Sequence, residues 1–263
     1  MSQAAGGTDL AGRDWWRPFS LSEKVSGLFT GRSGGLSAGP FATLNLSDDI
    51  GDDPAAVTAN RSIVLLAIAP GPSRLSWMHQ VHGATVAYVR TERAAAPRSD
   101  AIFTGSPAVA LGVLVADCAP VLLADPSAAL IGAAHAGRAG LAAGVVPALV
   151  TAMCQAGASA ARMRAVIGPA ICGRCYEVPA ELHDQVAATV PEAACVTRKG
   201  SHGIDIRAGV RSQLAEAGLA DIGDDRRCTA ESAELFSYRR DGRTGRFAGL
   251  IWLAPSRSGD DRS

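Results

Sequence analysis

The chain has 263 residues, and its 25 Lys and Arg residues balance 25 Asp and Glu residues, so the formal net charge is zero. This balance gives no basic surface for nucleic acid or anionic lipid, and a hydrophobic content of 48% excludes wholesale disorder. No apolar run reaches the roughly 18 residues of a membrane span, and the N-terminus lacks the pattern of a secretory signal. We therefore expect a soluble cytoplasmic protein that contacts neither nucleic acid nor membrane.

The N-terminal part of the chain begins with a polar tail and continues into a long loop and a helix. Residues 1–14 and 256–263 are small, polar and aperiodic, so we expect disordered ends around a single domain at 15–255. Residues 31–53 are rich in Gly, Ser and Asp, which is typical of a loop. Asp53 at the end of this loop and Pro54 directly after it predict a helix over residues 54–69.

The remainder of the chain interleaves predicted strands with predicted helices. Alternating or continuously apolar segments predict strands over residues 76–89, 108–116, 121–124, 129–134, 165–168 and 247–253. Helical periodicity predicts helices over residues 141–155, 180–189 and 206–217. The order lacks a strict strand–helix–strand rhythm, so the expected fold class is a mixed α/β domain.

The six cysteines are scattered, and without an export signal we expect reduced thiols. Cys172 and Cys175 have the C-x-x-C spacing of a redox pair or of half a zinc site. The sequence contains no second C-x-x-C that would complete a structural zinc site. We therefore expect five of the six cysteines, this pair included, to be ordinary thiols.

The segment His79-Gln-Val-His82-Gly83 is the first of three places where reactive side chains occur beside glycines. On a strand, two residues three positions apart point to opposite faces, so only one of the histidines is expected in a given site. His82 is the better candidate because the adjacent Gly83 allows close approach of the backbone.

Two further reactive segments follow apolar strands. Asp117 and Cys118 come at the end of a predicted strand, since Pro120 interrupts the ladder. His135 precedes a Gly-rich turn that contains Arg138, where backbone N–H groups and a guanidinium could bind an anion.

Together, His82, Cys118 and His135 make two chemical interpretations available. Two imidazoles and a thiolate suit zinc, and three protein ligands leave an open position that is typical of catalytic zinc. Without a metal, Cys118 and His135 could instead form a nucleophile–base pair. Residue spacing alone leaves both interpretations open.

Seven segments between about residue 25 and residue 254, in the same order, resemble the laccase-domain or YfiH-like family. These segments are NLSDDIGDD with the following Asn-Arg (45–61), HQVHG (79–83), SDAIFT (99–104), VADCAPVLLAD (115–125), AAHAGRAG (133–140), IGPAI with CYEV (167–178) and SYRRDGRTGRFAGLIWL (237–253). Members of this family have also been called polyphenol oxidases and peptidoglycan editing factors, and are now regarded as zinc-dependent purine nucleoside phosphorylases. The resemblance implies an α/β/β/α sandwich with mixed sheets, a fold shared with a cytotoxic deamidase.

The resemblance also implies an activity and a set of site residues. It implies phosphorolysis of adenosine, inosine, guanosine and S-methyl-5'-thioadenosine, which yields the free base and the sugar 1-phosphate, with adenosine deamination as a side activity. The zinc ligands carried over from the family are His82, Cys118 and His135, and copper is disfavoured. Cys118, His135 and Asp117 are the expected catalytic residues, and the expected substrate-binding residues are Asn45, Arg61, Arg138 and Arg239. The expected partners are nucleosides and phosphate, and the expected state is a monomer.

One segment departs from the family pattern. The family shows His-Ala-Gly-Trp-Arg-Gly, whereas His135-Ala-Gly137 is followed here directly by Arg138-Ala-Gly140. A shift of one residue at a helix start rotates a side chain by about 100°. The departure therefore bears on the position of Arg138 and on the surface available for a purine, but not on the three zinc ligands.

Three other functions compete with this interpretation. A metal-free cysteine hydrolase or amidase that edits a peptidoglycan precursor would use Cys118 and His135. A multicopper oxidase needs several histidine-rich copper sites, which the five histidines of this chain do not supply. A non-catalytic binding partner has no sequence feature in its favour beyond the polar termini.

Overall fold

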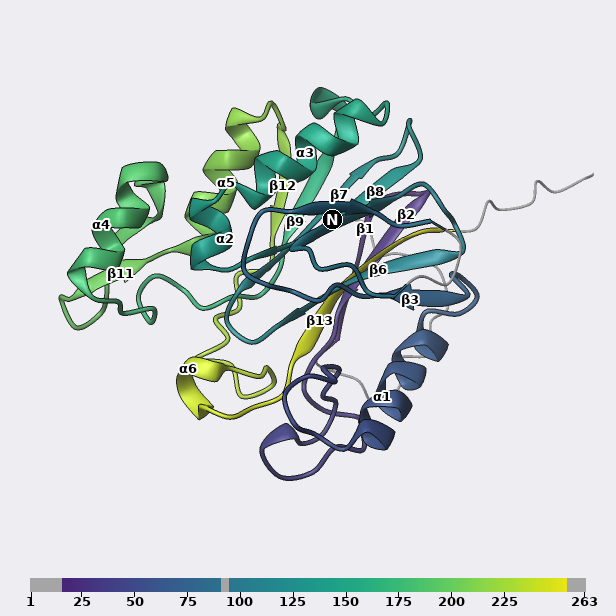
Figure 1. The fold of residues 1–263 in the computed structure, drawn as a ribbon, viewed down its shortest axis with the longest axis horizontal. Coiled ribbons are helices and arrows are strands. Elements are labelled where there is room, and N and C mark those ends of the chain that lie inside the picture. The colour runs from purple at the N-terminus through teal and green to yellow at the C-terminus, as the bar shows by residue number, and fades with distance from the viewer. Residues whose placement is uncertain (1–15, 91–94, 255–263) are drawn as a thin grey trace, which may run out of the picture.

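Two β-sheets lie face to face, with helices on their outer sides (Figure 1). This computed structural model describes residues 16–90 and 95–254, and the predicted disordered ends at 1–14 and 256–263 lie outside the described residues. Within the described residues, no helix is long and apolar enough to cross a bilayer. The arrangement is the α/β/β/α sandwich of a single domain, as expected.

The first sheet has five strands in the order β1-β2-β13-β6-β3. Its strands are β1 (Arg17–Ser22), β2 (Val25–Phe29), β13 (Phe247–Leu253), β6 (Val109–Val115) and β3 (Arg74–Ser76). All neighbours are antiparallel except β3, which runs parallel to β6. The last long strand of the chain therefore lies between strands from its N-terminal half.

The second sheet has six strands in the order β12-β9-β7-β8-β5-β4. Its strands are β12 (Asp221–Asp224), β9 (Arg164–Ile167), β7 (Ala119–Asp125), β8 (Leu130–Ala136), β5 (Ala101–Thr104) and β4 (Val86–Tyr88). The two outer pairs are parallel and the inner pairs are antiparallel, so the sheet is mixed. A short ribbon, β10 (Ala194–Val196) with β11 (His202–Ile204), lies apart from both sheets.

Helices cover the outer faces of both sheets. They are α1 (Pro54–Ala67), α2 (Arg138–Ala142), α3 (Val145–Gln155), α4 (Ala180–Thr189), α5 (Ile206–Glu216) and α6 (Tyr238–Asp241). Buried residues of α3 and α5 pack on the second sheet, whereas Val64 of α1 packs on the outer face of the first sheet. Figure 1 shows α1 on the opposite side of the sheets from α3 and α5.

The core between the sheets explains the continuous apolar runs of the central strands. Every residue of β7 and of β8 is buried, because one face meets the first sheet and the other meets the helices. Leu122 and Ile131 contribute to the layer between the sheets, and Leu123 contributes to the layer under the helices. A strand covered on both faces has no solvent side, so its sequence does not alternate.

Two predicted elements are wrong in extent. Residues 76–89, predicted as one strand, contain only the end of β3 and the whole of β4, separated by a loop at 77–85 in which Asp100 accepts the N–H groups that a ladder would use. Residues 141–155, predicted as one helix, belong to α2 and α3, which meet at Gly144 with a left-handed φ of 77°. Glycine adopts this conformation without the steric penalty of a side chain.

Candidate functional site

Three of the predicted residues come together at one end of the second sheet. His82 lies in the loop at 77–85, Cys118 lies in the turn between β6 and β7, and His135 lies near the end of β8. Their potential ligand atoms all lie within 4.8 Å of one another, and the two imidazole centroids are 4.7 Å apart at an interplanar angle of 80°. We call these three residues the His/Cys cluster.

The buried carboxylate of Asp100 orients two members of the His/Cys cluster, His82 and His135. Asp100 accepts a hydrogen bond from the backbone N–H of His82 at 2.8 Å and lies 2.9 Å from Nδ1 of His135. It also accepts the N–H of Gly83 at 2.7 Å. One carboxylate therefore fixes both the loop that carries His82 and the ring of His135, which leaves Nε2 as the ring nitrogen open to a ligand.

The electrostatics of the His/Cys cluster favour an ionised thiol. Burial opposes ionisation of Cys118, but the His135 charge and the hydrogen bonds from His135 and His82 outweigh it and lower the pKa of Cys118 to about 6. Burial likewise opposes the charge on His135, but the Cys118 thiolate and Asp100 raise the pKa of His135 to about 9. A thiolate is the form that binds a metal or acts as a nucleophile.

Gly137 leaves room for the His/Cys cluster. A Cβ at this position would lie 2.9 Å from Sγ of Cys118 and 3.1 Å from Cδ2 of His82. Both separations are closer than ordinary van der Waals contact, so any larger residue would displace one of these side chains. The glycine that follows β8 is therefore required by side-chain packing at the site.

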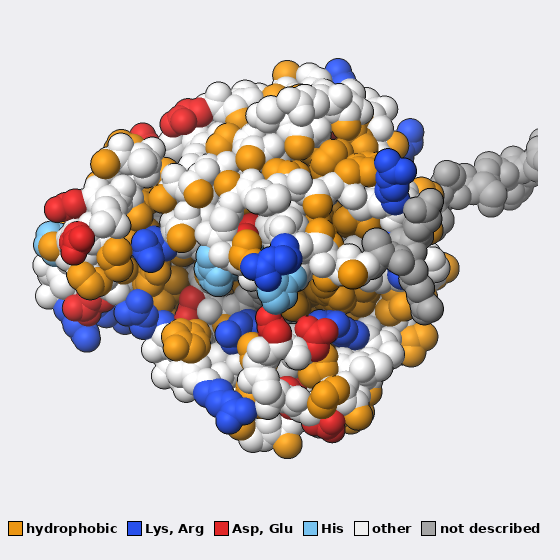
Figure 2. Space-filling model, viewed as in Figure 1, with side chains coloured by type: hydrophobic (Ala, Val, Ile, Leu, Met, Phe, Trp, Pro, Cys, Tyr) orange, Lys and Arg blue, Asp and Glu red, His pale blue; other side chains and the backbone are white. Residues whose placement is uncertain are grey.

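The His/Cys cluster lines a cavity of about 480 Å³. Polar and charged side chains share its walls with apolar ones, and the polar group includes Ser47, Asp49, Gln80, Asp117, Tyr176, Tyr238, Arg239 and Arg246. Figure 2 shows histidine, acidic and basic side chains around a hollow near the centre of one face. The volume falls within the range of roughly 300–1,000 Å³ that is typical of small-molecule sites.

Two basic side chains of the segment 237–253, Arg239 and Arg246, line the cavity. Arg239 stacks over the ring of Tyr176 at 5.0 Å and donates to the carbonyl oxygen of Glu177 at 2.9 Å. Arg246 is half-buried, and this burial lowers the pKa of its guanidinium, while the nearby Asp49 and Cys118 favour its charge. An anion in the cavity would therefore meet two guanidinium groups.

Arg138 interacts with Tyr176, a residue of the cavity wall. Burial and the Cys118 charge raise the pKa of the Tyr176 hydroxyl, and the positive charges of Arg138 and Arg239 oppose that rise. Arg138 therefore approaches the phenol from a different segment than Arg239 does. Among the residues that line the cavity, Arg138 itself is not found.

Asp117 faces the cavity but is fully engaged in hydrogen bonds. Its carboxylate accepts the hydroxyl of Ser237 at 2.7 Å and the backbone N–H of Arg239 at 2.6 Å, and it also accepts the hydroxyl of Thr229. Its φ of 102° is strained for a residue with a Cβ. These contacts place the Arg239 segment beside Cys118, and the predicted catalytic role of Asp117 stays a prediction.

Asn45 and Arg61 are not brought to the cavity wall. The Asn45 amide is fully buried, donating to Asp52 at 2.8 Å and accepting the N–H of Ser47 at 3.0 Å. Arg61 donates to the carbonyl of Leu46 and pairs with Asp48, both at 2.9 Å. Both side chains therefore hold the segment 45–49, which includes cavity residues, and direct contact with a substrate stays a prediction.

Residue types alone did not single out Asp100, Tyr176 or Arg246. Asp100 belongs to the SDAIFT segment, but nothing in the sequence indicates that its carboxylate contacts a histidine 35 positions later. Arg246 was visible in the same segment as Arg239, among many arginines. Only the spatial arrangement separates these residues from their neighbours.

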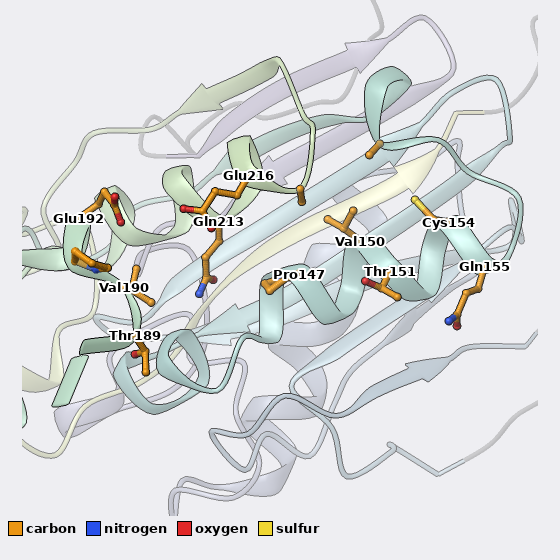
Figure 3. Close-up of a pocket in the computed structure, with 13 residues that line it drawn as sticks. Pro147, Val150, Thr151, Cys154, Gln155, Thr189, Val190, Glu192, Gln213 and Glu216 are labelled. Carbon is orange, nitrogen blue, oxygen red and sulfur yellow. The ribbon is translucent and has the colours of Figure 1, made fainter. Parts of the chain in front are cut away.

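A larger hollow of about 890 Å³ lies on the helical side, far from this chemistry. Figure 3 shows that Pro147, Val150 and Thr151 of α3 face Gln213 and Glu216 of α5 across it. Among the described residues, no histidine lines it, and its one cysteine, Cys154, belongs to no group of three or more potential metal ligands. The smaller cavity is therefore the candidate functional site.

Several known proteins are similar to this chain over most of its length. A purine nucleoside phosphorylase from Streptomyces coelicolor, SCO2081, is 52% identical over 227 residues, which cover 86% of this chain and 94% of that protein. A purine nucleoside phosphorylase from Mycobacterium tuberculosis, Rv2149c, is 46% identical over 235 residues, covering 89% and 94% of the two chains.

Solved structures share the fold. The crystal structure of YlmD from Geobacillus stearothermophilus superposes with a TM-score of 0.83 at 33% identity, covering 89% of this chain and 93% of that chain. The structure of NMB0706 from Neisseria meningitidis superposes with a TM-score of 0.81 at 36% identity, covering 89% and 96%. The family model described as multi-copper polyphenol oxidoreductase laccase matches residues 26–254. The chain therefore belongs to this laccase-like family, whose similar members include proteins named purine nucleoside phosphorylases.

Proposed function

We propose that this protein is a zinc-dependent purine nucleoside phosphorylase. The observation that carries the proposal is the His/Cys cluster, whose ligand atoms lie within 4.8 Å of one another at the wall of a cavity that also holds two arginines. The names of the similar proteins support the same reaction class. Phosphate and a purine nucleoside are the proposed substrates.

The donor set of the cluster fits zinc. His82, Cys118 and His135 offer two imidazoles and one thiolate, a borderline-soft set that leaves a fourth position open. Asp100 supplies the outer hydrogen bond that fixes a histidine ligand. Five histidines in the whole chain are too few for several copper sites, which favours zinc over a multi-copper centre despite the family description. When bound, zinc supplies a Lewis acid at this wall.

The residues of the chain have separable tasks in phosphorolysis. In this reaction a phosphate oxygen forms the bond to the sugar C1' as the bond from C1' to the base nitrogen breaks, and the base leaves with the electron pair. Arg239 and Arg246 are the groups that would bind and orient the phosphate. Asp117 accepts the backbone N–H of Arg239, whose guanidinium stacks over the Tyr176 ring.

We further propose that the cavity accepts more than one purine nucleoside. Adenosine, inosine, guanosine and S-methyl-5'-thioadenosine share a purine and a ribose, and Tyr176 and Tyr238 offer aromatic faces at the cavity wall. Stacking on aromatic faces tolerates different ring substituents.

Deamination of adenosine is the proposed side activity, since a Lewis acid that activates an oxygen also supports hydrolysis. The protein is proposed to act in the cytoplasm as a monomer.

The test is base release from each nucleoside with and without phosphate. The zinc-loaded protein should release adenine only when phosphate is present, and Cys118→Ala should lose at least 100-fold, in line with loss of a metal ligand. Cys154→Ser, which changes a cysteine outside the cavity, is the matched control and should keep full activity. Base release that is independent of phosphate for every nucleoside would overturn the proposal.

The thiolate–imidazolium pair favours one alternative, a metal-free cysteine hydrolase or amidase acting on a peptidoglycan precursor. The lowered pKa of Cys118 beside His135 is the property that such a nucleophile needs. Metal removal separates the two functions, because a chelator should abolish phosphorolysis but leave a cysteine hydrolase active. An activity that survives complete metal removal and is lost on alkylation of Cys118 would favour the hydrolase.

A further inference from the structure

Three thiols and a carboxylate converge at a second place, apart from the cavity. Cys172 and Cys175 lie in the turn after β9, whereas Cys228 and Glu231 lie in the segment after β12. Their four potential ligand atoms lie within 4.8 Å of one another. We call these four residues the three-thiol cluster. The sequence predicts that Cys172 and Cys175 are ordinary thiols, but the fold brings Cys228 and Glu231 beside them.

The dimensions of the three-thiol cluster suit a single tetrahedral ion. With Zn–S bonds of about 2.3 Å, sulfur ligands of a tetrahedral zinc lie about 3.8 Å apart. The observed atoms therefore need to approach by at most about 1 Å in any pair to close on the ion. Thiolate with carboxylate is a zinc donor set, and four protein ligands make the closed coordination of a structural site.

The backbone around the thiols already provides supporting contacts. The N–H of Cys172 donates to Sγ of Cys228 at 3.3 Å, and the N–H of Glu231 donates to the carbonyl of Cys228 at 3.1 Å. The N–H of Thr229 donates to the carbonyl of Ala170 at 3.2 Å, which holds the two segments side by side. The thiols are thus positioned by main-chain hydrogen bonds, the kind of outer contact that fixes metal ligands.

Charge is balanced by arginines outside the cluster. Three thiolates and one carboxylate around a divalent ion leave two negative charges in excess. Arg198 donates to Sγ of Cys175 at 3.0 Å and pairs with Glu231, and the charge of Arg174 also favours the ionised form of Glu231. Two cations therefore stand next to the cluster, which lowers the cost of gathering four anionic ligands in one place.

We propose that Cys172, Cys175, Cys228 and Glu231 bind a structural zinc ion, distinct from the His/Cys cluster. On binding, each thiol releases its proton to the solvent as its bond to zinc forms, and no oxidant or reductant takes part. The ion would join segments that are 56 residues apart in the chain. It would thereby hold Tyr176 and Thr229, which follow Cys175 and Cys228, in their places near Asp117 and the cavity.

The test uses the full chain with Cys118→Ala, which removes the only thiol of the His/Cys cluster. After exchange into cobalt, this variant should bind about one tightly held ion per chain and show thiolate-to-cobalt charge-transfer absorption. A second change, Cys228→Ser, should abolish that absorption, whereas Cys154→Ser in the same background should preserve it. The outcome is independent of phosphorolysis, because Cys118→Ala already lacks a ligand of the cavity site.

A protection experiment covers the case in which Cys228→Ser fails to fold. Zinc should slow alkylation of Cys172, Cys175 and Cys228 in Cys118→Ala at least 10-fold, with no effect on Cys154, as peptide mapping by mass spectrometry would report. Absence of thiolate absorption from the cobalt-loaded Cys118→Ala protein would overturn the proposal. Equal alkylation rates with and without zinc, or a disulfide within the three-thiol cluster in freshly purified protein, would also overturn it.

Discussion

Asp100, which directly precedes β5, and His135 of β8 are both buried, and their side chains lie 2.9 Å apart at the candidate site. Asp100→Asn should weaken zinc binding about 10–100-fold, because an amide holds the ring less firmly and no longer favours its ligating form. A chelator competition assay measures the change. Asp184→Asn is the matched control, since Asp184 contacts His183 at 3.0 Å on the surface. Unchanged zinc affinity in Asp100→Asn would show that this carboxylate has no part in the site.

The tight packing around Gly137 predicts a second mutational effect on the site. Gly137→Ala should lower both zinc affinity and activity at least 10-fold while leaving the fold intact, because its Cβ would lie 2.9 Å from Sγ of Cys118. Zinc titration together with circular dichroism checks both parts. Gly105→Ala is the control, because Gly105 lies outside the site and its added Cβ would be 3.3 Å from the nearest atom. Wild-type zinc affinity in Gly137→Ala would contradict the packing argument.

At the scale of the element, Asp125 closes the hairpin between β7 and β8. Its buried carboxylate accepts the N–H of Ser127 at 3.0 Å and of Ser159 at 2.8 Å, and it pairs with Arg162 at 2.9 Å. Burial raises the pKa of Asp125, but these hydrogen bonds outweigh it and hold the pKa below its usual value. The hairpin and the segment before β9 therefore share one anionic anchor.

The sign of the pH effect follows from that lowered pKa. Stability from Asp125 is fully present above the unfolded pKa of about 3.9 and is lost as the pH falls through the lower folded pKa. Asp125→Asn should cost about 1–3 kcal/mol at neutral pH, and the difference from wild type should shrink below about pH 4. Urea unfolding across pH measures it, with the exposed Asp221→Asn as control. A difference independent of pH would contradict the assignment.

The elements also show what the sequence could and could not predict. Helix α1 was predictable because Asp53 caps it and Pro54 begins it, and both are local signals. The loop at 77–85 was not predictable, because its backbone donors bond to Asp100 rather than to a neighbouring strand. His82 was preferred over His79 because Gly83 follows it, and the structure brings His82 beside Cys118 and His135, although the segment is a loop and not the predicted strand. Its role as a metal ligand stays a prediction.

Long-range contacts account for most of what the sequence left undetermined. Cys228 and Cys172 are 56 residues apart, so the C-x-x-C spacing could not reveal the third thiol. Short strands such as β10 and β12 carry no apolar alternation and form by pairing with partners that follow from the tertiary structure. Local periodicity predicted only a mixed α/β domain. The resemblance to the family over most of the chain predicted the two-sheet sandwich.

Apolar side chains between the two sheets pack on β7 and β8, the strands next to Cys118 and His135. Leu122→Ala in this layer should lower the free energy of unfolding by about 2–5 kcal/mol through the cavity it leaves. Leu66→Ala on α1, where the side chain is 74% exposed, is the control and should change it by less than about 0.5 kcal/mol. Chemical denaturation measures both, and equal effects would contradict the assigned core.

The sugar product of adenosine cleavage distinguishes phosphorolysis at the His/Cys cluster from hydrolysis. The zinc-loaded protein, incubated with adenosine and inorganic phosphate, is predicted to form ribose 1-phosphate in an amount equal to the adenine released, as mass spectrometry and phosphorus NMR would record. Free ribose in place of ribose 1-phosphate, or no cleavage of any purine nucleoside by the zinc-loaded protein, would contradict it.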